Sequence, residues 1–529
     1  MTEKLAPTGR DVRRWAGHPQ ALSPDDLRTE SQRDVDRIIY SRAWARLAGV
    51  TQVVTPTRVG PMTHNRMTHS LKVAQVGRTL ALALQGSVDP WSIRGVEVDP
   101  MTVYAASLAH DLGHPPFGHI GEQQLNAWAE RKGLDGFEGN AQSFRILTRL
   151  EPRRRDRPGM DVTGATLNAV LKYPWLRLAR DERDGHAAGP TELDPLYKLK
   201  REKWGAYNSD ADSFRWARKS QAGLPDDRQA LEAAIMDTAD DFTYALHDLD
   251  DFAQARLIDP SEISFDARLS LRYDRDEIGV PGKSYGGSNP ITRIGEKLQR
   301  DYPDRFDKAA WLESLSYFAD AERWLRDPRT DDLEEVEALP HDPAEESPDE
   351  AGSQAGGSHW LLPPQNETRV RLREWTSHQL TVFSRALRLE DHHGWPHLAM
   401  EASEWHFMQI LKGITRTYIV SRTDLSAIQF SQGRVLGNLC DDLLSWYQTD
   451  PKRVPERLLL LTSRAYDFVQ NEGIVENYRE PKSKNTTSGA QRGVVDFVAE
   501  LTDHQALELH RVLSGHGSTS MVDGILNIF

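Results

Sequence analysis

The chain is poor in cysteine and contains no long apolar run. Cys440 is the single cysteine among 529 residues, which excludes an internal disulfide and a metal site built from Cys-x-x-Cys pairs. No apolar stretch approaches the roughly 20 residues that a membrane helix needs. The polar stretch MTEKLAPTGRDVRRW at the beginning is not the pattern of a signal peptide. We therefore expect a cytoplasmic protein that does not associate with membranes.

Two common nucleotide-binding loops are also missing. The sequence has neither a GxxxxGK[ST] loop nor a GxGxxG turn, so P-loop and dinucleotide-binding folds are not indicated. The formal net charge is −14, which argues against a protein that coats nucleic acid. Attraction for a nucleotide must therefore come from a local group of cations.

Apolar residues recur at helical spacing through much of the chain, and this pattern predicts a mainly α fold with few short strands. The clearest segments are 229–252, 400–420, 433–446, 457–469 and 493–513. Residues 327–359 instead combine acids, prolines, glycines and serines with very few large apolar side chains. Such a composition cannot bury enough surface to order itself, so we expect an acidic, flexible loop there. A docking peptide for a basic partner is the alternative.

The stretch HDLGHPPFGH, residues 110–119, carries the strongest chemical signal. An adjacent histidine and aspartate follow the apolar segment MTVYAASLA, which places His110 and Asp111 in the last turn of a buried helix. The PPFG that comes next ends this helix. Imidazole and carboxylate together bind divalent cations of intermediate hardness, and the remaining histidines can transfer protons near neutral pH. A metal and phosphate site is therefore the favoured interpretation.

Two further segments supply the residues that a complete site needs. The amphipathic stretch that starts at His64 places His69 in the first turn of a helix, and the stretch from Ala233 predicts a helix with a dense carboxylate cluster. With these segments, the chain resembles the HD-domain superfamily of metal-dependent phosphohydrolases, and within it the deoxyguanosine triphosphate triphosphohydrolase family. Family-like blocks include SRAWARLAGVTQV, NRMTHSLKVAQV, GFEGNAQSFRIL, VLKYPW and VVDFVAELTD, so the resemblance runs from about residue 30 to about residue 515.

The resemblance implies one divalent metal ion, Mn²⁺ or Mg²⁺ and alternatively Fe or Co. Its ligands would be the side chains of His69, His110, Asp111 and Asp240. Two imidazoles and two carboxylates leave coordination positions open, as activation of water or phosphate requires. Asp241 follows Asp240 directly, and we favour Asp240 because of the residues that lie further along the same helical face.

Tyr244 and Asp248 follow Asp240 at intervals of four residues, so all three lie on one side of a helix. In the family that the chain resembles, such a tyrosine packs on the deoxyribose and such a carboxylate binds the 3′-hydroxyl. The resemblance also assigns Gln52 to the sugar 3′-hydroxyl. The alternative for Tyr244 is an ordinary half-buried core aromatic.

Arg66 lies three residues before His69, almost one helical turn away, so both side chains can face one polyphosphate. Lys172 and Lys203 resemble the phosphate-contacting lysines of the family. For either lysine, a solvated surface charge is the alternative.

His119 and Glu122 form an i, i+3 pair at the start of the next predicted helix. A carboxylate behind an imidazole orients the ring and raises its basicity, which suits acid or base catalysis. His114 is a further catalytic candidate, and we favour His119. Some relatives carry a histidine in an FEHN block, where this chain has Gly139. Any role of that histidine is absent here or taken by another residue.

The activity implied by the resemblance is attack of water on the α-phosphorus of a deoxynucleoside triphosphate (dNTP), which releases the deoxynucleoside and tripolyphosphate. Residues 1–529 would form a single unit, with an HD core over about 30–260 and a helical C-terminal part over about 365–529. The resemblance also implies a homo-oligomer, a hexamer in preference to a tetramer, with a nucleotide effector or single-stranded DNA as a candidate ligand at a secondary site.

Two other classes of function stay open on the sequence alone. One is an HD phosphohydrolase or phosphodiesterase that acts on another nucleotide, against which Gln52, Tyr244 and Asp248 argue. The other is a catalytically idle nucleotide- or DNA-responsive regulator, which would carry a broken metal set. Base preference, whether dGTP alone or several dNTPs, does not follow from these residues.

Overall fold

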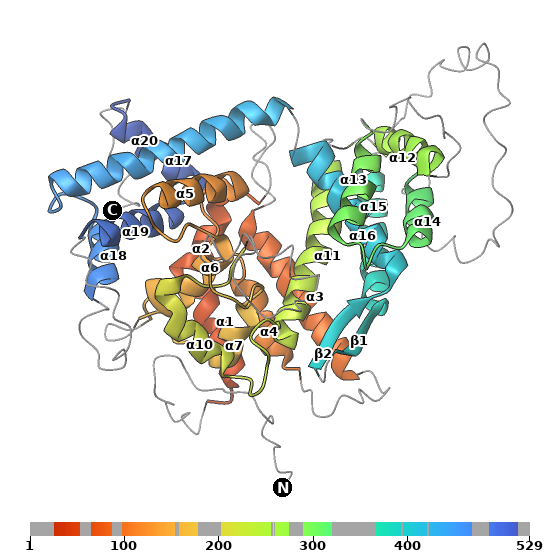
Figure 1. Cartoon of the computed structure of the whole chain (residues 1–529), viewed down its shortest axis with the longest axis horizontal. Coiled ribbons are helices and arrows are strands. Elements are labelled where there is room, and N and C mark those ends of the chain that lie inside the picture. Colours follow the sequence, from red (N-terminus) through yellow and green to blue (C-terminus); the bar gives the residue numbers. More distant parts are fainter. Residues whose placement is uncertain are drawn as a thin grey trace, which may run out of the picture. The chain divides into compact units, whose positions relative to one another are not determined.

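The protein is mainly α-helical, as the apolar periodicity predicts (Figure 1). The computed structural model describes residues 26–52, 65–86, 98–153, 158–177, 203–254, 258, 260–274, 289–319, 365–392, 395–420, 423–467 and 486–516. The one sheet of these ranges is two-stranded, β1 (Leu387–His392) pairing with β2 (Trp395–Met400), and isolated β-bridges join Thr51 to Asn65 and Leu176 to Ala206. Within the same ranges, no helix is long and apolar enough to cross a lipid bilayer.

The chain divides into two compact units. Unit 1 comprises Met1–Thr243, Leu389–Ala399 and Val420–Phe529, and unit 2 comprises Tyr244–Arg388 and Met400–Ile419. The boundary at residue 243 falls inside helix α11 (Leu231–Gln254). The helical C-terminal part expected over about 365–529 is therefore shared between the units, because helices far apart in the sequence pack together in each.

Unit 1 contains the first helices of the chain and the last ones. They are α1 (Glu30–Ile39), α2 (Arg42–Arg46), α3 (Arg66–Gly86), α4 (Pro100–Ala109), α5 (Gly118–Arg131), α6 (Gly139–Arg145), α7 (Gly164–Val170), α10 (Ala211–Arg218), α17 (Thr423–Thr449), α18 (Glu456–Asp467), α19 (Thr486–Ala499) and α20 (Asp503–Leu513). Short 3₁₀ turns at Leu47–Gly49 and Asn208–Asp210 and a π-helical turn at Ile146–Leu150 connect some of them.

Unit 2 is built from helices α12 (Pro260–Asp274), α13 (Pro290–Asp301), α14 (Lys308–Ala319), α15 (Gln365–Arg385) and α16 (Ala402–Ile414). A π-helical turn, Thr415–Val420, follows α16. Helices α12, α13 and α16 pack with α14 into a small bundle around Trp311 and Phe318, which are buried. The expected helical segment 400–420 is thus α16 and its π-helical extension.

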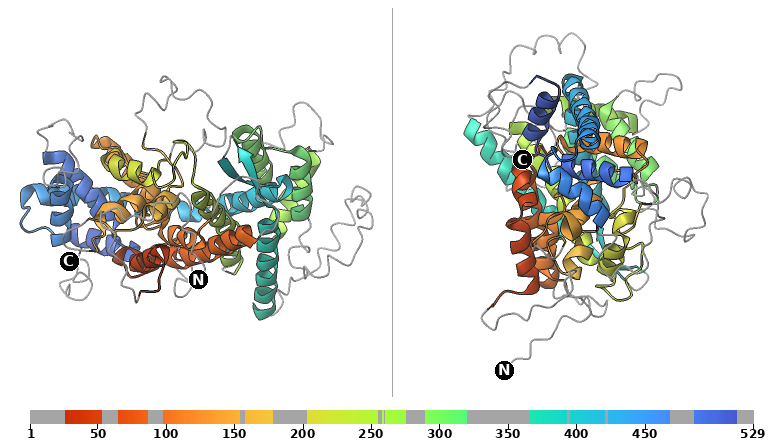
Figure 2. Two further views of the ribbon diagram at one scale, coloured as in Figure 1. Left: turned by 90° about the horizontal axis from the view of Figure 1, so that it is seen from below. Right: turned by 90° about the vertical axis from the view of Figure 1, so that its left-hand side faces the viewer.

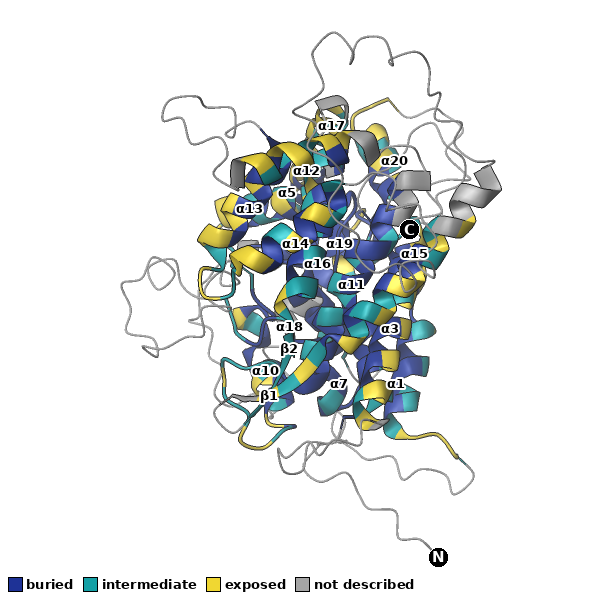
Figure 3. Ribbon diagram, turned by 90° about the vertical axis from the view of Figure 1, so that its right-hand side faces the viewer, coloured by how far each residue is buried: buried dark blue, intermediate teal, exposed yellow. Residues whose placement is uncertain are grey.

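Helix α4 is the centre of unit 1, since α1, α3 and α7 all pack against it. Asp99 begins α4 by accepting a hydrogen bond from the Met101 amide, and Pro100 occupies the first turn, both of which favour a helix start. Its alanines at 105, 106 and 109 are fully buried and allow neighbouring helices to approach closely. Figure 3 colours the residues by burial, and helices such as α12 and α13 carry both buried and exposed residues along their length. The packing around α4 fixes the end of this helix, where the histidines lie.

The C-terminal helices cover α5. Helix α17 packs against α5, α19 and α20, and the two views of Figure 2 place these blue helices beside the orange α5. The segment 493–513, expected as one periodic stretch, is two helices separated at 500–502. Thr502 and Gln505 form a capping box that begins α20. The backbone of Thr502 is extended, which interrupts the helical conformation between α19 and α20.

A buried ion cluster joins α6 to α19. The Arg145 guanidinium donates to Asp210 and to Asp496, and all three side chains are almost completely buried. Buried charges need such paired partners to be tolerated. The acidic loop expected over 327–359 lies outside the described residues.

Candidate functional site

The turn that follows α4 carries the predicted site residues. Helix α4 ends at Ala109, His110 is its C-cap residue, and Asp111 comes next, so the pair lies one to two residues beyond the end of the helix and not in its last turn, where the sequence predicts it. Gly113 fits closely against α6, because a Cβ atom there would lie 2.2 Å from the Ser143 nitrogen and 2.3 Å from the Gly139 oxygen. The Ser143 hydroxyl also donates to the His110 carbonyl oxygen. These contacts hold the turn in one position against α6.

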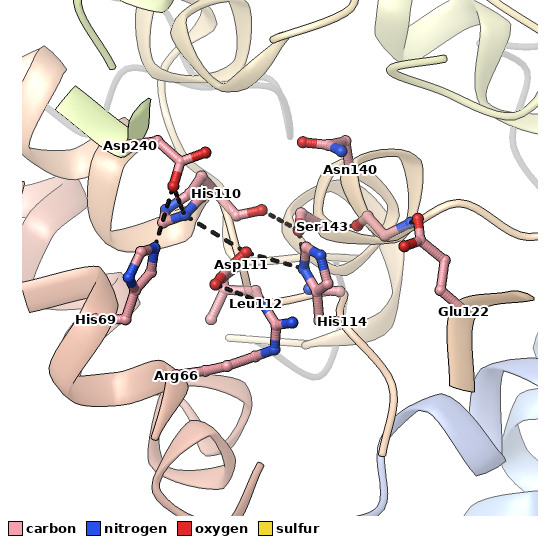
Figure 4. A network of polar contacts seen from close by, with 12 residues as sticks. Arg66, His69, His110, Asp111, Leu112, His114, Glu122, Asn140, Ser143 and Asp240 are labelled. Carbon is pink, nitrogen blue, oxygen red and sulfur yellow. Dashed lines mark hydrogen bonds and ion pairs between the residues drawn. The ribbon is translucent and has the colours of Figure 1, made fainter. Parts of the chain in front are cut away.

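Three of the four predicted metal ligands come together. One ligand atom from each of His69, His110 and Asp240 lies within 4.8 Å of the other two. His69 Nε2 is 3.1 Å and His110 Nε2 is 3.6 Å from the same Asp240 oxygen. Figure 4 shows the three side chains pointing toward one another from α3, the end of α4 and α11.

The orientation of the His110 ring fits a metal ligand. Its Nδ1 lies 2.7 Å from the Ser107 carbonyl oxygen and so carries the proton. Nε2 then faces Asp240, and this buried atom has no hydrogen-bond partner within the part of the chain that the structure describes, so its lone pair becomes available to a cation once Nε2 loses its proton. A metal-binding histidine commonly donates its other ring N–H to a carbonyl in this way. The donor set therefore fits a divalent cation of intermediate hardness.

Asp111, the fourth predicted ligand, lies between His110 and His114 (Figure 4). One of its oxygens is 3.4 Å from His110 Nε2 and 2.9 Å from His114 Nδ1, and the other accepts from Arg66 at 2.7 Å. The structure thus places Asp111 beside His110 but outside the closely spaced set of His69, His110 and Asp240. Its assignment as a ligand remains a prediction.

The charged side chains of the site strongly shift one another's pKa values. Burial alone would lower the pKa of His110, but the carboxylates of Asp111 and Asp240 outweigh burial and raise this pKa to about 9. Burial opposes ionisation of Asp111, yet Arg66 and the neighbouring histidines hold the Asp111 pKa well below its usual range. The site therefore combines ionised carboxylates with a proton on His110 that a cation would displace.

The remaining histidines differ in exposure. The His114 side chain is 8% exposed, and burial together with the Arg66 charge lowers the pKa of His114 to about 4. The His119 side chain is 63% exposed, and its Nδ1 lies 3.1 Å from Glu122 Oε2. The predicted pair of His119 and Glu122 is thus in contact, with the ring open to solvent and the carboxylate behind it.

The two predicted phosphate lysines have different surroundings. Lys172 Nζ lies 2.8 Å from Asp237 and 2.8 Å from Asp240, the oxygen of the latter being the one that does not face His69. Lys203 is more exposed and lies 3.5 Å from Glu122 and 3.4 Å from Glu138. Lys172 therefore contacts a predicted metal ligand, whereas Lys203 lies beside the His119 and Glu122 pair.

Glu138 is a site residue that the sequence argument did not single out. It begins α6 by accepting hydrogen bonds from the amides of Asn140 and Ala141. Burial, together with the nearby Glu122 carboxylate, raises the pKa of Glu138 to about 7 despite the Lys203 charge. Glutamate is not one of the residues preferred at helix N-caps, so no local pattern marks this position as part of the site.

Gln52 and Arg66 lie near the metal ligands. The Arg66 guanidinium bonds Asp111 and reaches the Gln52 carbonyl oxygen at 3.4 Å. The Gln52 side-chain oxygen is buried without a hydrogen-bond partner among the described residues. Buried polar atoms are nearly always satisfied in folded proteins, so such an atom is suited to a ligand.

Tyr244 and Asp248 continue α11 beyond Asp240 and belong to unit 2. Asp248 is fully buried and Tyr244 is half-buried. Because α11 is continuous from Leu231 to Gln254, both residues lie on the same helical face as Asp240, as predicted. Their contacts with a sugar remain predictions.

Comparison with known proteins gives the same picture. The HD domain family matches residues 66–245. A deoxyguanosinetriphosphate triphosphohydrolase-like protein of Streptomyces coelicolor is 33% identical over 501 residues, which cover 92% of this chain and 93% of the relative. Proteins with the same description from Corynebacterium efficiens and Corynebacterium glutamicum are 42% and 37% identical, over 56% and 55% of this chain and 62% of each relative.

The first of these relatives aligns along almost the whole of both chains, and the HD match contains the converging residues His69, His110 and Asp240. The chain belongs to the deoxyguanosinetriphosphate triphosphohydrolase-like family of HD-domain phosphohydrolases.

Proposed function

We propose that this protein hydrolyses deoxynucleoside triphosphates, dGTP among them, to the deoxynucleoside and tripolyphosphate. The observation that carries the proposal is the convergence of His69, His110 and Asp240 beside the buried guanidinium of Arg66. The names of the relatives point to the same substrate class. The reaction breaks the bond between the α-phosphorus and O5′, forms a bond from a water oxygen to that phosphorus, and returns a proton to O5′.

A divalent cation would be held by His69, His110 and Asp240, with Asp111 as the adjacent fourth candidate. Such an ion supplies Lewis-acid activation of water and phosphate. The chain's own residues would do the rest. The Arg66 guanidinium would bind phosphate oxygens, and Lys203 would add a second positive charge beside the His119 and Glu122 pair.

Proton transfer falls to His119 in this proposal. Its ring is exposed and therefore accessible to a substrate, and the Glu122 carboxylate orients it from behind. His114 is buried between Asp111 and the ring of His119, whose centroid is 6.0 Å away. We assign His114 to hydrogen bonding near the phosphates, while Gln52, Tyr244 and Asp248 are assigned to the deoxyribose.

The test is incubation of the purified protein with each of the four dNTPs and with GTP, with Mn²⁺ or Mg²⁺, in water enriched in ¹⁸O. Anion-exchange separation should give deoxynucleoside and tripolyphosphate in equal amounts. The label should appear in tripolyphosphate and not in the nucleoside, because water attacks phosphorus. Monophosphate or pyrophosphate as the product would instead indicate a different HD phosphohydrolase.

The site assignment is tested separately by variants. His110→Ala and Asp111→Ala should abolish hydrolysis, whereas His378→Ala, an exposed histidine on α15, should not. Full hydrolysis by the His110→Ala and Asp111→Ala double variant would refute the assignment of the metal site.

A further inference from the structure

Asp503, at the start of α20, joins two segments of the site that are far from it in the sequence. One carboxylate oxygen accepts from the Phe117 amide at 2.9 Å. The other accepts from the Thr51 amide at 3.1 Å and from the Thr51 hydroxyl at 2.6 Å. Because the Asp503 side chain is buried, these charge-assisted bonds are little weakened by competing water.

Each bonded residue lies one or two positions before a proposed functional residue. Thr51 comes directly before Gln52, and Phe117 comes two residues before His119. Phe117 has a φ of 64°, a left-handed conformation that a non-glycine residue adopts only when its surroundings hold it there. The hydrogen bond from its amide to Asp503 is one of the interactions that hold this turn.

The two segments also touch each other. A Cβ atom on Gly118 would be in ordinary contact with the backbone oxygens of Thr51 and Gln52, at 3.5 Å, and would lie 3.3 Å from Arg66 Nη2. Arg66 in turn reaches the Gln52 carbonyl oxygen. A change in the position of Phe117 relative to Thr51 would therefore alter the spacing of Gln52, Arg66 and His119.

Asp503 is itself firmly held. The capping box of Thr502 and Gln505 fixes the first turn of α20, and a Cβ atom on Gly49 would lie 2.7 Å from Thr502. Arg46 makes a second link at this corner, since it donates to the carbonyl oxygens of Leu501, Leu112 and His114. Residues 501–503 thus contact the catalytic turn, residues 110–118, in two ways. Asp503 binds the Phe117 amide directly, and Arg46 bridges Leu501 to the carbonyl oxygens of Leu112 and His114.

We propose that Asp503 is a positioning residue for the proposed hydrolysis, which sets the distance between the sugar-binding residue Gln52 and the proton-transferring residue His119. It acts through Thr51 and Phe117 and contacts neither substrate nor metal. The inference rests on the proposed function, and it extends the site to a helix more than 380 residues away in the chain.

The test uses the full-length Asp503→Asn variant. Its amide keeps one oxygen acceptor and presents an NH₂ group where the second oxygen was, so it cannot accept from both Phe117 and Thr51. We expect kcat to fall on the order of 10- to 100-fold, the loss typical of a small misplacement of catalytic groups. Mn²⁺ affinity, measured by calorimetry, should be unchanged, because the variant touches none of His69, His110 and Asp240.

Hydrogen–deuterium exchange provides a readout that needs no substrate. In Asp503→Asn, exchange should accelerate in peptides that contain Thr51 and Phe117 while α17 and α19 stay protected. Thr51→Val, which removes the hydroxyl bond, should show the same pattern more weakly, and Thr51→Ser should restore protection. Glu508→Gln, which removes a half-buried carboxylate of the same helix that pairs with Arg511, is the matched control and should leave both kcat and exchange unchanged.

Two results would overturn the inference. One is uniform loss of protection across the C-terminal helices with kcat per folded molecule unchanged, which would make Asp503 a general anchor of the fold. The other is unchanged exchange at Thr51 and Phe117 in Asp503→Asn. If the wild-type protein hydrolyses no dNTP, the proposed function fails, and the exchange pattern still decides whether Asp503 positions the two segments.

Discussion

The ammonium of Lys172 lies 2.8 Å from Asp240 Oδ2, on the carboxylate whose other oxygen faces His69 and His110. Asp237 lies on the other side of the same ammonium. Burial opposes the charge on Lys172, but the two carboxylates raise the Lys172 pKa well above its usual range. The lysine therefore stays charged and fixes the rotamer of a predicted metal ligand.

This contact predicts that Lys172→Gln weakens metal binding. Loss of a group that orients a ligand costs roughly 10- to 100-fold in metal affinity, so we expect a loss of this order in calorimetric titrations with Mn²⁺. Lys203→Gln is the matched control, because Lys203 contacts Glu122 and Glu138 and none of the converging ligands. Equal metal affinity in the two variants would show that Lys172 acts on phosphate alone.

Metal binding should depend on pH through His110. The pKa of His110 is about 9 in the metal-free protein, so a cation must displace a proton from this ring at neutral pH. Affinity should then rise about tenfold per pH unit from near neutrality and level off above about pH 9. Calorimetry in two buffers with different ionisation enthalpies should count about one proton released per ion. A flat affinity between about pH 7 and pH 9 would contradict this expectation.

His119→Asn should separate proton transfer from metal binding. Removal of a general acid or base typically costs about 10²- to 10⁴-fold in rate, and we expect kcat to fall within this range while Mn²⁺ affinity is retained. Glu122→Gln should show a smaller loss, because it removes only the group that orients the ring. If His119→Asn keeps the wild-type kcat, proton transfer must be assigned to His114 or to solvent.

Gly113→Ala should destabilise the turn that holds the site. The added methyl group would overlap the backbone of Ser143 and Gly139, and overpacking of this kind costs about 1–3 kcal/mol or more. Gly433→Ala on α17 is the control, since its nearest neighbour, Gln124 Oε1, would be 3.5 Å away. In that variant the free energy of unfolding should rise by about 0.5–1 kcal/mol, because alanine favours a helix more than glycine does. Urea unfolding of both variants measures the difference.

Arg145→Met should lower the free energy of unfolding much more than Arg215→Met does. The first leaves the buried carboxylates of Asp210 and Asp496 without their shared cation, which costs about 3–5 kcal/mol. The second breaks an ion pair whose arginine side chain is 60% exposed, and such pairs contribute about 1 kcal/mol or less. Similar free energies of unfolding for the two variants would contradict this reading of the cluster.

Local sequence patterns predicted much of the fold. Helix α4 follows from the apolar segment 101–109, although it ends at Ala109, several residues before PPFG, and α11 follows from periodicity over 229–252. The break between α19 and α20 was missed, although Thr502 and Gln505 carry the capping-box pattern that marks a helix start. Apolar periodicity continues across that break because both helices bury a face against α17. Periodicity alone could not separate them.

The site was predictable where neighbours in sequence act together, as with His119 and Glu122. The link between Lys172 and Asp240 joins positions 68 residues apart, and its existence depends on how α11 packs beside the KYPW turn. The same holds for Glu138, whose burial and closeness to Lys203 arise from the fold. No local pattern encodes these distances.

The bonds from Asp503 to Thr51 and Phe117 span 452 and 386 positions, and this span has a consequence for folding during synthesis. A ribosome releases residues 51 and 117 long before residue 503 emerges, so the nascent chain holds the catalytic turn without its carboxylate partner for most of translation. Contacts between residues so far apart in the sequence form late and slowly. The HD segment should consequently reach its working geometry only after the last helices have docked.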